Sequence, residues 1–478
     1  MSGMSESRPD ANADQAPWGA FLGAGAEDWR VWQQDAQGLC RLELSGRWAA
    51  KPSMGLLGAA GGKVEARLVR METGAPVNAD LDWRGLETAA DGTWRGQLEN
   101  VPAGGLYRLE TRFNPKGNKL GEWSLRGDLR RFLGVGDIWL LAGQSNASGY
   151  GRKPYHELPE LGTHALRADG AWALASHPLH DSTATRFPAS RENYNNGHSP
   201  FLRFAKELRS VLGHPIGLVP GALGGSPLSA WHPGRGPLFR NLLEMARHAG
   251  GAVKGLLWYQ GETDAEPGTA EDYLQRFVDS VAGWRKALGQ PELPILTVQL
   301  SRYRSERPGE EDLQWAQVRE AQRQAALRDG RIFVVPALDL PLDDTIHIGS
   351  EGNLTLGARL AACALGAVYG KPLAWRAPEL AETGLDGEKG VRLRFDHVVS
   401  RLDSLDPTAN PWRVADGDGV IPVEKAVYFQ RDSVRLALAR PWRGEVSVSC
   451  GYGENPAPLP VDVERQMPVL AFHAVAAC

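Results

Sequence analysis

Five apolar runs alternate with helical patterns between about residues 134 and 370, and this alternation most constrains what the chain can fold into. The runs cover residues 137–142, 215–220, 253–259, 294–300 and 331–337. Strands separated by helices pair in parallel, because each helix carries the chain back to the start of the next strand, and helices then cover both faces of the sheet. We therefore predict an α/β domain around a central parallel sheet.

Patterns of period two flank this domain on both sides. Apolar and charged residues alternate in residues 64–70 and again in residues 391–395, as expected for strands with one buried face. A chain of 478 residues suits about three domains. We predict a disordered tail over residues 1–24, an N-terminal β-sandwich over 25–133, the α/β domain over 134–371 and a C-terminal β-domain over 372–478.

The charge balance argues against several classes of partner. The 53 basic and 57 acidic residues give a net charge of −4, and no basic block occurs. Nucleic acid and anionic membranes are therefore not expected as main partners. No apolar stretch reaches membrane-spanning length, and residues 1–15 show no secretory leader. We expect a cytoplasmic protein, or a secreted one whose leader has been removed, of unknown oligomeric state.

The cysteines and histidines give no sign of a metal or cofactor. Cys40, Cys363, Cys450 and Cys478 are scattered without paired spacing, which fits neither a disulfide framework nor a zinc cluster. The chain also lacks His-x-His and His-Glu-x-x-His motifs. We expect no metal ligands and no cofactor.

Two polar motifs stand where an α/β domain places its chemistry. The run Ile138–Ala142 is followed by Gly143-Gln144-Ser145-Asn146, which puts a serine at the carboxyl edge of the predicted sheet. Most Gly-x-Ser turns are only turns. The second motif, Asp344-Thr345-Ile346-His347, lies in a loop before the last helical pattern, where an aspartate can also simply cap the helix.

Together with the strand end Trp258-Tyr259-Gln260-Gly261-Glu262, these motifs resemble the SGNH hydrolases, specifically the branch of sialate O-acetylesterases and related carbohydrate acetylesterases. The resemblance implies a flavodoxin-like, three-layer α/β/α fold. It also implies a serine esterase that removes O-acetyl groups from acetylated mono- or oligosaccharides through an acetyl-enzyme. Sialic acid and xylan or xyloglucan oligomers all remain open as the sugar. One departure is Ala147, where the family usually has methionine.

The resemblance also implies the roles of a catalytic triad. Ser145 is the nucleophile, His347 is the base, and Asp344 holds the base in the correct tautomer. The adjacent Asp343 is an alternative for the last role. Acid and base lie together at the end of the domain and the serine opens it, which argues against an α/β-hydrolase order.

Oxyanion donors and substrate contacts follow from the same resemblance. The expected donors are the N–H of Ser145, the N–H of Gly225 or its neighbour Gly224, and the side-chain amide of Gln260. Possible substrate-binding residues are Trp231, His232, Asn196 and Glu262, of which Glu262 is expected to support neighbouring loops. The pair Arg319-Glu320 in a helical segment is interpreted as a structural, buried ion pair.

Three other functions compete with this interpretation. A metal-dependent deacetylase would use His347, Asp344 and a further histidine, but no ligand set has metal spacing. A non-catalytic carbohydrate-binding protein would not need the intact motifs. A lipase, or an esterase or thioesterase of non-carbohydrate esters, usually has a long apolar lid, which the sequence does not show.

Overall fold

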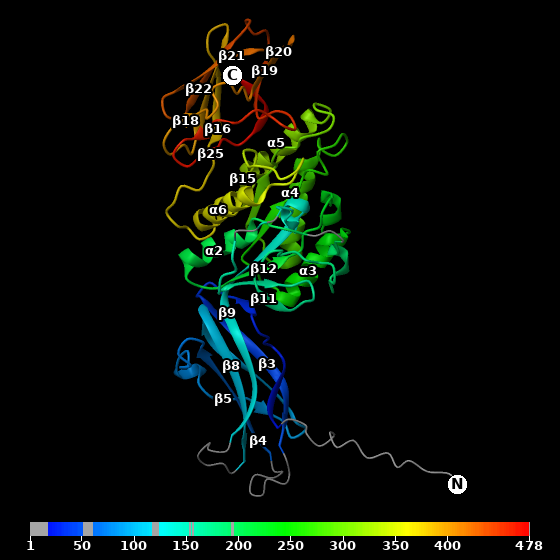
Figure 1. Ribbon diagram of the computed structural model, residues 1–478, viewed down its shortest axis with the longest axis vertical. Coiled ribbons are helices and arrows are strands. Elements are labelled where there is room, and N and C mark those ends of the chain that lie inside the picture. The colour runs from blue at the N-terminus through cyan, green and yellow to red at the C-terminus, as the bar shows by residue number, and fades with distance from the viewer. Residues whose placement is uncertain are drawn as a thin grey trace, which may run out of the picture. The chain divides into compact units, whose positions relative to one another are not determined.

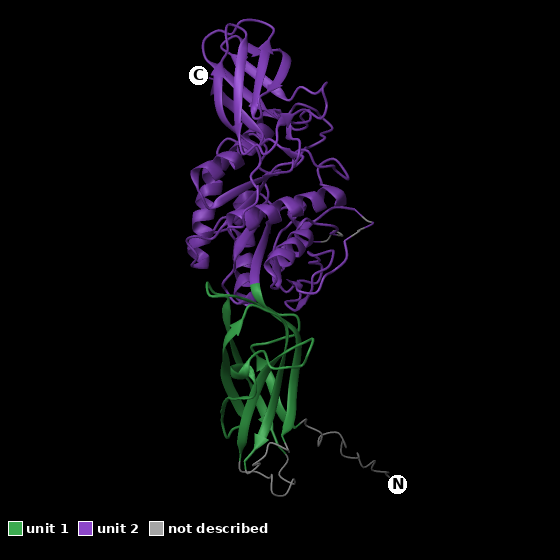
Figure 2. Cartoon of the chain, turned by 90° about the vertical axis from the view of Figure 1, so that its left-hand side faces the viewer, with its two compact units in different colours: residues 1–136 green, residues 137–478 purple. Residues whose placement is uncertain are grey.

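The structure is a computed structural model that describes residues 18–50, 61–116, 124–152, 154, 157–192 and 196–477. The chain divides into two compact units, Met1–Gly136 and Asp137–Cys478 (Figure 2). The boundary falls within strand β9 (Leu125–Gly143). Among the described helices, none combines the length and the apolar character that crossing a membrane requires.

Unit 1 consists of strands with short connections. The antiparallel sheet β1-β3-β7-β6 contains β1 (Gly19–Ala24), β3 (Leu39–Ala49), β7 (Thr93–Pro102) and β6 (Glu87–Thr88). A second set pairs β4 (Gly62–Arg70) with β5 (Arg84–Gly85) and β8 (Gly104–Pro115). In turn, β8 pairs with β9, and β2 (Val31–Gln33) runs parallel to β9. A 3-10 turn, η2 (Ala79–Leu81), precedes β5.

The predicted disordered tail over residues 1–24 needs a correction at its end. Residues 1–17 lie outside the described residues, but Gly19–Ala24 form β1, which pairs with β3. The Gly- and Ala-rich composition of this segment suggested a tail. The segment instead contributes to the core of unit 1, where Ala20 is fully buried beside large apolar side chains such as Leu44 and Trp94. The alternation predicted for residues 64–70 is confirmed, because Val64, Ala66 and Leu68 are buried.

Unit 2 contains a mainly parallel sheet in the order β11-β10-β12-β9-β13-β14-β15. Its strands besides β9 are β10 (Thr163–Leu166), β11 (Trp172–Leu174), β12 (Ile216–Pro220), β13 (Gly255–Tyr259), β14 (Ile295–Gln299) and β15 (Ile332–Pro336). Along this order β11 pairs antiparallel with β10, and the other neighbouring strands pair in parallel. The five apolar runs predicted as strands correspond to the end of β9 and to β12–β15. The loops after these parallel strands all begin at the same edge of the sheet.

Helices connect the strands of this sheet (Figure 1). After the short α1 (Ser145–Ser148), the chain forms α2 (Phe201–Leu212), α3 (Pro237–Ala249), α4 (Tyr273–Leu288), α5 (Asp312–Arg328) and α6 (Ser350–Ala367). The 3-10 turns η3 (Pro188–Ser190) and η4 (Leu228–Trp231) lie between them. Helix α2 contacts α6, whereas α3 contacts α4 and α4 contacts α5.

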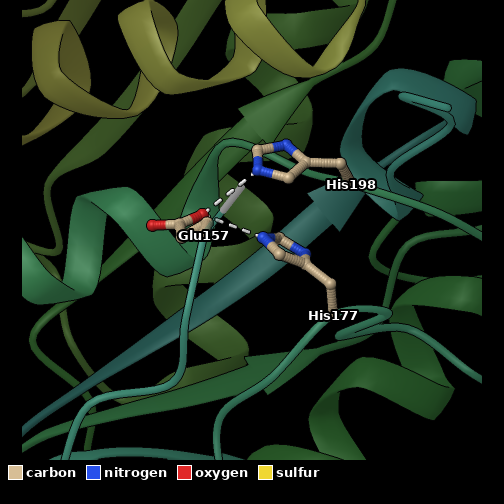
Figure 3. A group of neighbouring side chains, drawn as sticks. All are labelled: Glu157, His177 and His198. Carbon is tan, nitrogen blue, oxygen red and sulfur yellow. Dashed lines mark hydrogen bonds and ion pairs between the residues drawn. The ribbon is translucent and has the colours of Figure 1, made fainter. Parts of the chain in front are cut away.

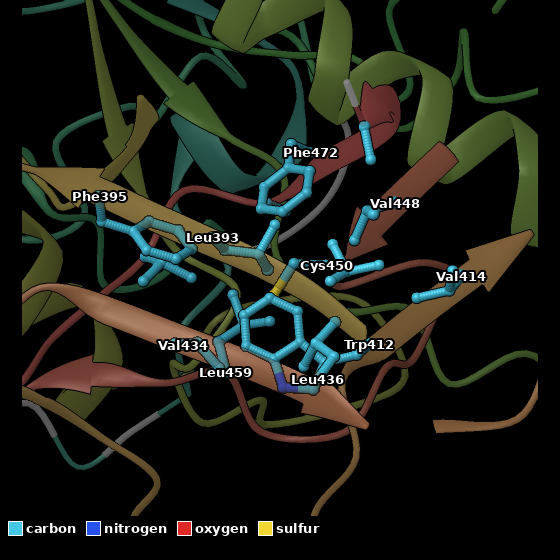
Figure 4. Close-up of a cluster of buried hydrophobic side chains, with 14 of the residues drawn as sticks. Leu393, Phe395, Trp412, Val414, Val434, Leu436, Val448, Cys450, Leu459 and Phe472 are labelled. Carbon is cyan, nitrogen blue, oxygen red and sulfur yellow. The ribbon is translucent and has the colours of Figure 1, made fainter. Parts of the chain in front are cut away.

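The remainder of unit 2 is antiparallel and follows α6. One sheet has the order β16-β17-β22-β21 and another β20-β19-β23-β26, with the small sheet β18-β24-β25 beside them. Apolar side chains of these strands form one buried cluster, shown in Figure 4, with Leu393, Val434, Val448 and Phe472 among its members. The strands are β16 (Glu379–Leu385), β17 (Gly390–Asp396), β18 (Leu402–Asp403), β19 (Trp412–Asp416), β20 (Gly419–Ile421), β21 (Val423–Phe429), β22 (Ser433–Leu438), β23 (Val446–Cys450), β24 (Val461–Asp462), β25 (Met467–Pro468) and β26 (Phe472–Ala477).

The predicted ion pair between Arg319 and Glu320 is wrong. Consecutive residues of a helix point about 100° apart, so the two side chains leave α5 in different directions. Glu320 pairs with Arg323, at 2.8 Å. Arg319 is 1% exposed and donates to backbone carbonyls, among them that of Ser301 at 2.6 Å and that of Glu454 at 3.2 Å. Burial lowers the pKa of its guanidinium to about 9. Through these hydrogen bonds Arg319 connects α5 to the loop after β23.

Replacing Arg319 by methionine tests this role. Arg319→Met leaves several buried carbonyls without donors, so the free energy of unfolding of unit 2 should fall by at least about 3 kcal/mol. Urea unfolding followed by circular dichroism measures the change. The control is Arg328→Met, an exposed arginine of the same helix, which should change stability by less than about 0.5 kcal/mol. Equal stability of the two variants would contradict the role assigned to Arg319.

Candidate active site

Ser145 begins α1, directly after β9 ends at Gly143. Gly143 has a φ of +131°, and a Cβ built on it would lie 2.0 Å from the carbonyl oxygen of Tyr259 on the neighbouring β13. Only glycine therefore fits at this position. The chain turns sharply here and places Ser145 in the lining of a cleft of about 680 Å³. Ser145 itself is 8% exposed.

His347 lines the same cleft and is bonded to Asp344. The distance from Nδ1 of His347 to Oδ2 of Asp344 is 2.8 Å, while Oδ1 accepts the N–H of His347 at 2.7 Å and that of Ile346 at 2.9 Å. Burial alone would raise the pKa of Asp344, but these hydrogen bonds hold it below its ordinary value. Asp344 is thus an ionised acceptor that fixes the imidazole ring.

Asp343, the alternative residue for this role, makes a different contact. Its Oδ2 accepts the backbone N–H of Arg152 at 2.7 Å. Tyr150 covers one face of the His347 ring. The two rings are stacked, with 4.6 Å between their centroids. The hydroxyl of Tyr150 donates to Oε1 of Glu192 at 2.7 Å.

Asn146 joins the loops that surround Ser145. Its Nδ2 donates to Oε1 of Glu262 at 2.8 Å and to the carbonyl of Ile346 at 3.3 Å, and its Oδ1 accepts the N–H of Ile348 at 3.0 Å. Burial raises the pKa of Glu262 to about 7. Through its bond to Asn146, the side chain of Glu262 supports the loop that carries Ser145. It also lines the cleft.

Two backbone N–H groups at the positions expected for oxyanion donors have no acceptor within the described part of the chain. These are the N–H groups of Ser145 and Gly225, both of which line the cleft. Gly225 has a φ of +64° and open space where a Cβ would point. The N–H of Gly224, in contrast, donates to Oε1 of Glu192 at 2.7 Å. Of the two glycines, Gly225 is the one available to a ligand.

The structure differs from the sequence prediction at Gln260. This side chain is fully buried and lies outside the cleft lining. Its Nε2 donates to Oδ2 of Asp264 at 2.6 Å, and its Oε1 accepts the hydroxyl of Tyr273 at 2.9 Å. The amide is therefore already used within the fold. A polar residue at the end of a strand can point to either side of the following loop, which the sequence does not reveal.

Three predicted substrate contacts also lie outside the cleft lining. Trp231 is fully buried and packs edge-on against Trp258, with 5.4 Å between ring centroids. His232 accepts the N–H of Gly234 at 3.1 Å, and the buried Asn196 donates to the backbone carbonyl of His180. Ala147, the departure from the family pattern, is buried.

Several cleft residues were not predicted. Gln144 lines the cleft beside Ser145, and its Oε1 accepts the N–H groups of Gly261 at 3.4 Å and Thr263 at 3.2 Å. Its position next to the serine was the only signal in the sequence. The cleft is also rich in acidic residues: Glu192, Glu262, Glu266 and Glu311 line it, together with Arg191 and His347.

A group that could hold a metal ion lies outside this cleft lining. The side chains of Glu157, His177 and His198 converge in unit 2, as Figure 3 shows, with one ligand atom from each within 4.8 Å of the others. No metal ligands were expected from the sequence, because these residues come from separate loops and form no recognisable motif.

Comparisons with known proteins agree with one another. Residues 135–366 match a protein family described as carbohydrate esterase, sialic acid-specific acetylesterase. A probable carbohydrate esterase of Arabidopsis thaliana is 32% identical over 247 residues, which are 47% of this chain and 88% of that protein. The sialate O-acetylesterase of Homo sapiens is 27% identical over 306 residues, so the match spans 54% of this chain and 58% of the human protein. A solved carbohydrate acetylesterase from Xanthomonas citri shares the fold, with a TM-score of 0.65 and 24% identity over 95% of this chain and 99% of that one.

The raised pKa of Glu262 predicts a pH dependence of stability. The folded chain keeps a proton that the unfolded chain releases between pH about 4.5 and 7, so the free energy of unfolding falls as the pH rises through this window, at most by about 1.4 kcal/mol per unit. Glu262→Gln removes this contribution and keeps an oxygen for Asn146. Its stability relative to the wild type should therefore rise by about 2–3 kcal/mol between pH 5 and pH 8, measured by urea unfolding. The matched control is Glu266→Gln, an exposed carboxylate of the same cleft. A constant difference for Glu262→Gln across this range would refute the prediction.

Proposed function

The chain belongs to the carbohydrate esterase family of sialic acid-specific acetylesterases and is a carboxylic ester hydrolase, and we propose that Ser145, His347 and Asp344 are its catalytic triad. The observation that carries the proposal is the bond between Nδ1 of His347 and Asp344, in a loop that lines the same cleft as Ser145. The reaction is the hydrolysis of O-acetyl esters of carbohydrates.

In the proposed mechanism, the Oγ of Ser145 attacks the acetyl carbonyl while Nε2 of His347 takes the hydroxyl proton. Asp344, bonded at Nδ1, stabilises the charged ring. The tetrahedral intermediate then expels the sugar oxygen, which receives the proton from His347. A water molecule, deprotonated by His347, attacks the acetyl-enzyme; acetate leaves and the proton returns to Ser145.

The oxyanion of both intermediates would accept the N–H groups of Ser145 and Gly225. We propose Gln144 as the third donor, in place of Gln260. The Oε1 of Gln144 is held by two backbone N–H groups, which leaves its Nε2 group for the cleft.

A side-chain donor of this kind contributes on the order of 3 kcal/mol to the stability of the transition state. Gln144→Met should therefore lower kcat about a hundredfold with little change in KM.

The proposed fold assignment is the three-layer α/β/α sandwich of SGNH hydrolases, over residues 134–371, with flanking β-domains over 19–133 and 372–478. The parallel order β12-β9-β13-β14-β15 supports the assignment of the central layer. The separate contacts of α2 with α6 and of α3, α4 and α5 with one another suit two helical layers.

For the substrate, we propose an acetylated neutral sugar. Four glutamates, one of them (Glu262) with a pKa raised to about 7, and one arginine line the cleft, which disfavours a sugar that carries its own carboxylate, as sialic acid does. Glu192 is suited to bind a sugar hydroxyl: Tyr150 and Gly224 hold its Oε1, and its buried Oε2 has no hydrogen-bond donor among the described residues.

Removal of the nucleophile is the direct test of the mechanism. Ser145→Ala should lower kcat for acetate release from an acetylated sugar by a factor of about 10⁴, with an unchanged Tm. The control is Ser148→Ala, the other serine of α1, which should keep most of the activity. Activity of Ser145→Ala above a few per cent of the wild type would show that another group attacks the ester.

Two aspartate variants distinguish the alternatives for orienting His347. Asp344→Asn should lower kcat by a factor of about 10⁴, because the amide disturbs the tautomer of the ring. Asp343→Asn should change kcat less than about tenfold, since its carboxylate binds the backbone of Arg152. The opposite ranking would assign the role to Asp343.

The charge of the cleft predicts a substrate preference. The kcat/KM for acetylated xylose oligomers should exceed that for O-acetylated sialic acid at least about tenfold. Glu192→Gln removes one negative charge from the cleft, so the ratio of these two kcat/KM values should be smaller in this variant. Free acetate is measured in both cases. A preference for sialic acid that is lost in Arg191→Gln would instead show carboxylate recognition by Arg191 and overturn the neutral-sugar proposal.

A further inference from the structure

One carboxylate oxygen of Glu157 meets two imidazole rings in the interior of unit 2 (Figure 3). Its Oε2 lies 2.9 Å from Nε2 of His177 and 3.2 Å from Nε2 of His198. The three side chains are only 2%, 2% and 1% exposed, and the centroids of the two rings are 4.0 Å apart. Burial of a carboxylate with two imidazole rings is costly unless the groups bind one another or a metal ion.

The spacing of these atoms matches that of metal ligands. Two ligand atoms of a tetrahedral zinc ion with bonds of about 2.0 Å are separated by about 3.3 Å. The two separations between oxygen and nitrogen at Glu157 are close to this value, and all three ligand atoms lie within 4.8 Å of one another, so a modest adjustment of the rings would bring them to one ion. The second carboxylate oxygen or a water molecule would complete the coordination.

We propose that Glu157, His177 and His198 form a binding site for a divalent transition-metal ion, with zinc as the ion best suited to two imidazoles and one carboxylate. The role of the ion is structural. The backbone of His198 pairs with Gly151, with His198 N–H donating at 2.8 Å and Gly151 N–H at 3.1 Å. Nδ2 of Asn353 on α6 donates to the carbonyl of His198 at 2.9 Å.

These contacts connect the metal group to the active-site region. Gly151 follows α1, which carries Ser145, and Asn353 follows the loop of His347. The ion would join segments at the beginning, middle and end of the connection between α1 and α2. The same connection supplies Arg191 and Glu192 to the cleft.

The ammonium group of Lys206 would compete with the ion for the carboxylate of Glu157. Its Nζ lies 3.7 Å from Oε1 of Glu157 and also donates to the carbonyl of Leu158 at 3.1 Å. Its side chain is 23% exposed, so it can turn to solvent when a cation binds. Removal of this positive charge should therefore strengthen metal binding, an effect that general damage to the fold would not produce.

The experiment is a calorimetric titration of the untagged full chain, stripped with EDTA and dialysed, with zinc chloride. One ion should bind with a Kd below about 10 µM, and a free zinc concentration a hundredfold above Kd should raise the Tm by about 5 °C. Lys206→Met should lower the Kd about tenfold or more. Binding should be lost in the double variant His177→Gln, His198→Gln.

Two controls locate the ion. His214→Gln removes a histidine that pairs with Asp137, at 2.9 Å, and it should leave the titration unchanged. His347→Gln should also retain the binding.

Absence of binding by the wild type, or weakening of binding by Lys206→Met, would overturn the proposal. Loss of binding in His347→Gln alone would place the ion at the catalytic pair and would overturn it too. Since these measurements do not depend on ester hydrolysis, they stand apart from the proposed activity.

Discussion

The buried amide of Asn146 is the interaction on which the geometry of the site depends. It donates to Glu262, which is 116 positions away in the chain, and it binds the backbone on both sides of His347, about 200 positions away. The loops after β9, β13 and β15 are thereby held by one side chain. A side chain with a donor and an acceptor on the same plane can do this, whereas an apolar residue of the same size cannot. The position of His347 relative to α1 follows from this bonding.

The sequence was sufficient for the features that depend on local patterns. The apolar runs identified the strands, the alternation of residues 64–70 identified a half-buried strand, and the Asp344–His347 spacing identified a carboxylate and a ring on one short loop. Each of these depends on period, length or proximity along the chain. The end of β9 at Gly143 was equally visible, because a buried strand followed by a glycine requires a turn.

The features that the sequence did not reveal depend on side-chain direction and on distant segments. Gln260 follows a strand as expected, but Asp264 and Tyr273 orient its amide into the interior. Arg319 binds backbone carbonyls rather than its neighbour in the helix, and no pattern marks carbonyls that need a donor. The group of Glu157 with its two histidines assembles from different loops. Its members have no periodic relation that a reader of the sequence could detect.

The stack of Tyr150 on His347 has a consequence for the charge that the reaction creates. The hydroxyl of Tyr150 is bonded to Glu192, which fixes the plane of the ring at 21° to that of the imidazole. In the proposed mechanism His347 accepts a proton, and the stack then holds an imidazolium over a π face, an arrangement that is favourable by about 0.5–2 kcal/mol. The ring of Tyr150, which carries no charge, would thereby stabilise the imidazolium at the moment the proton arrives.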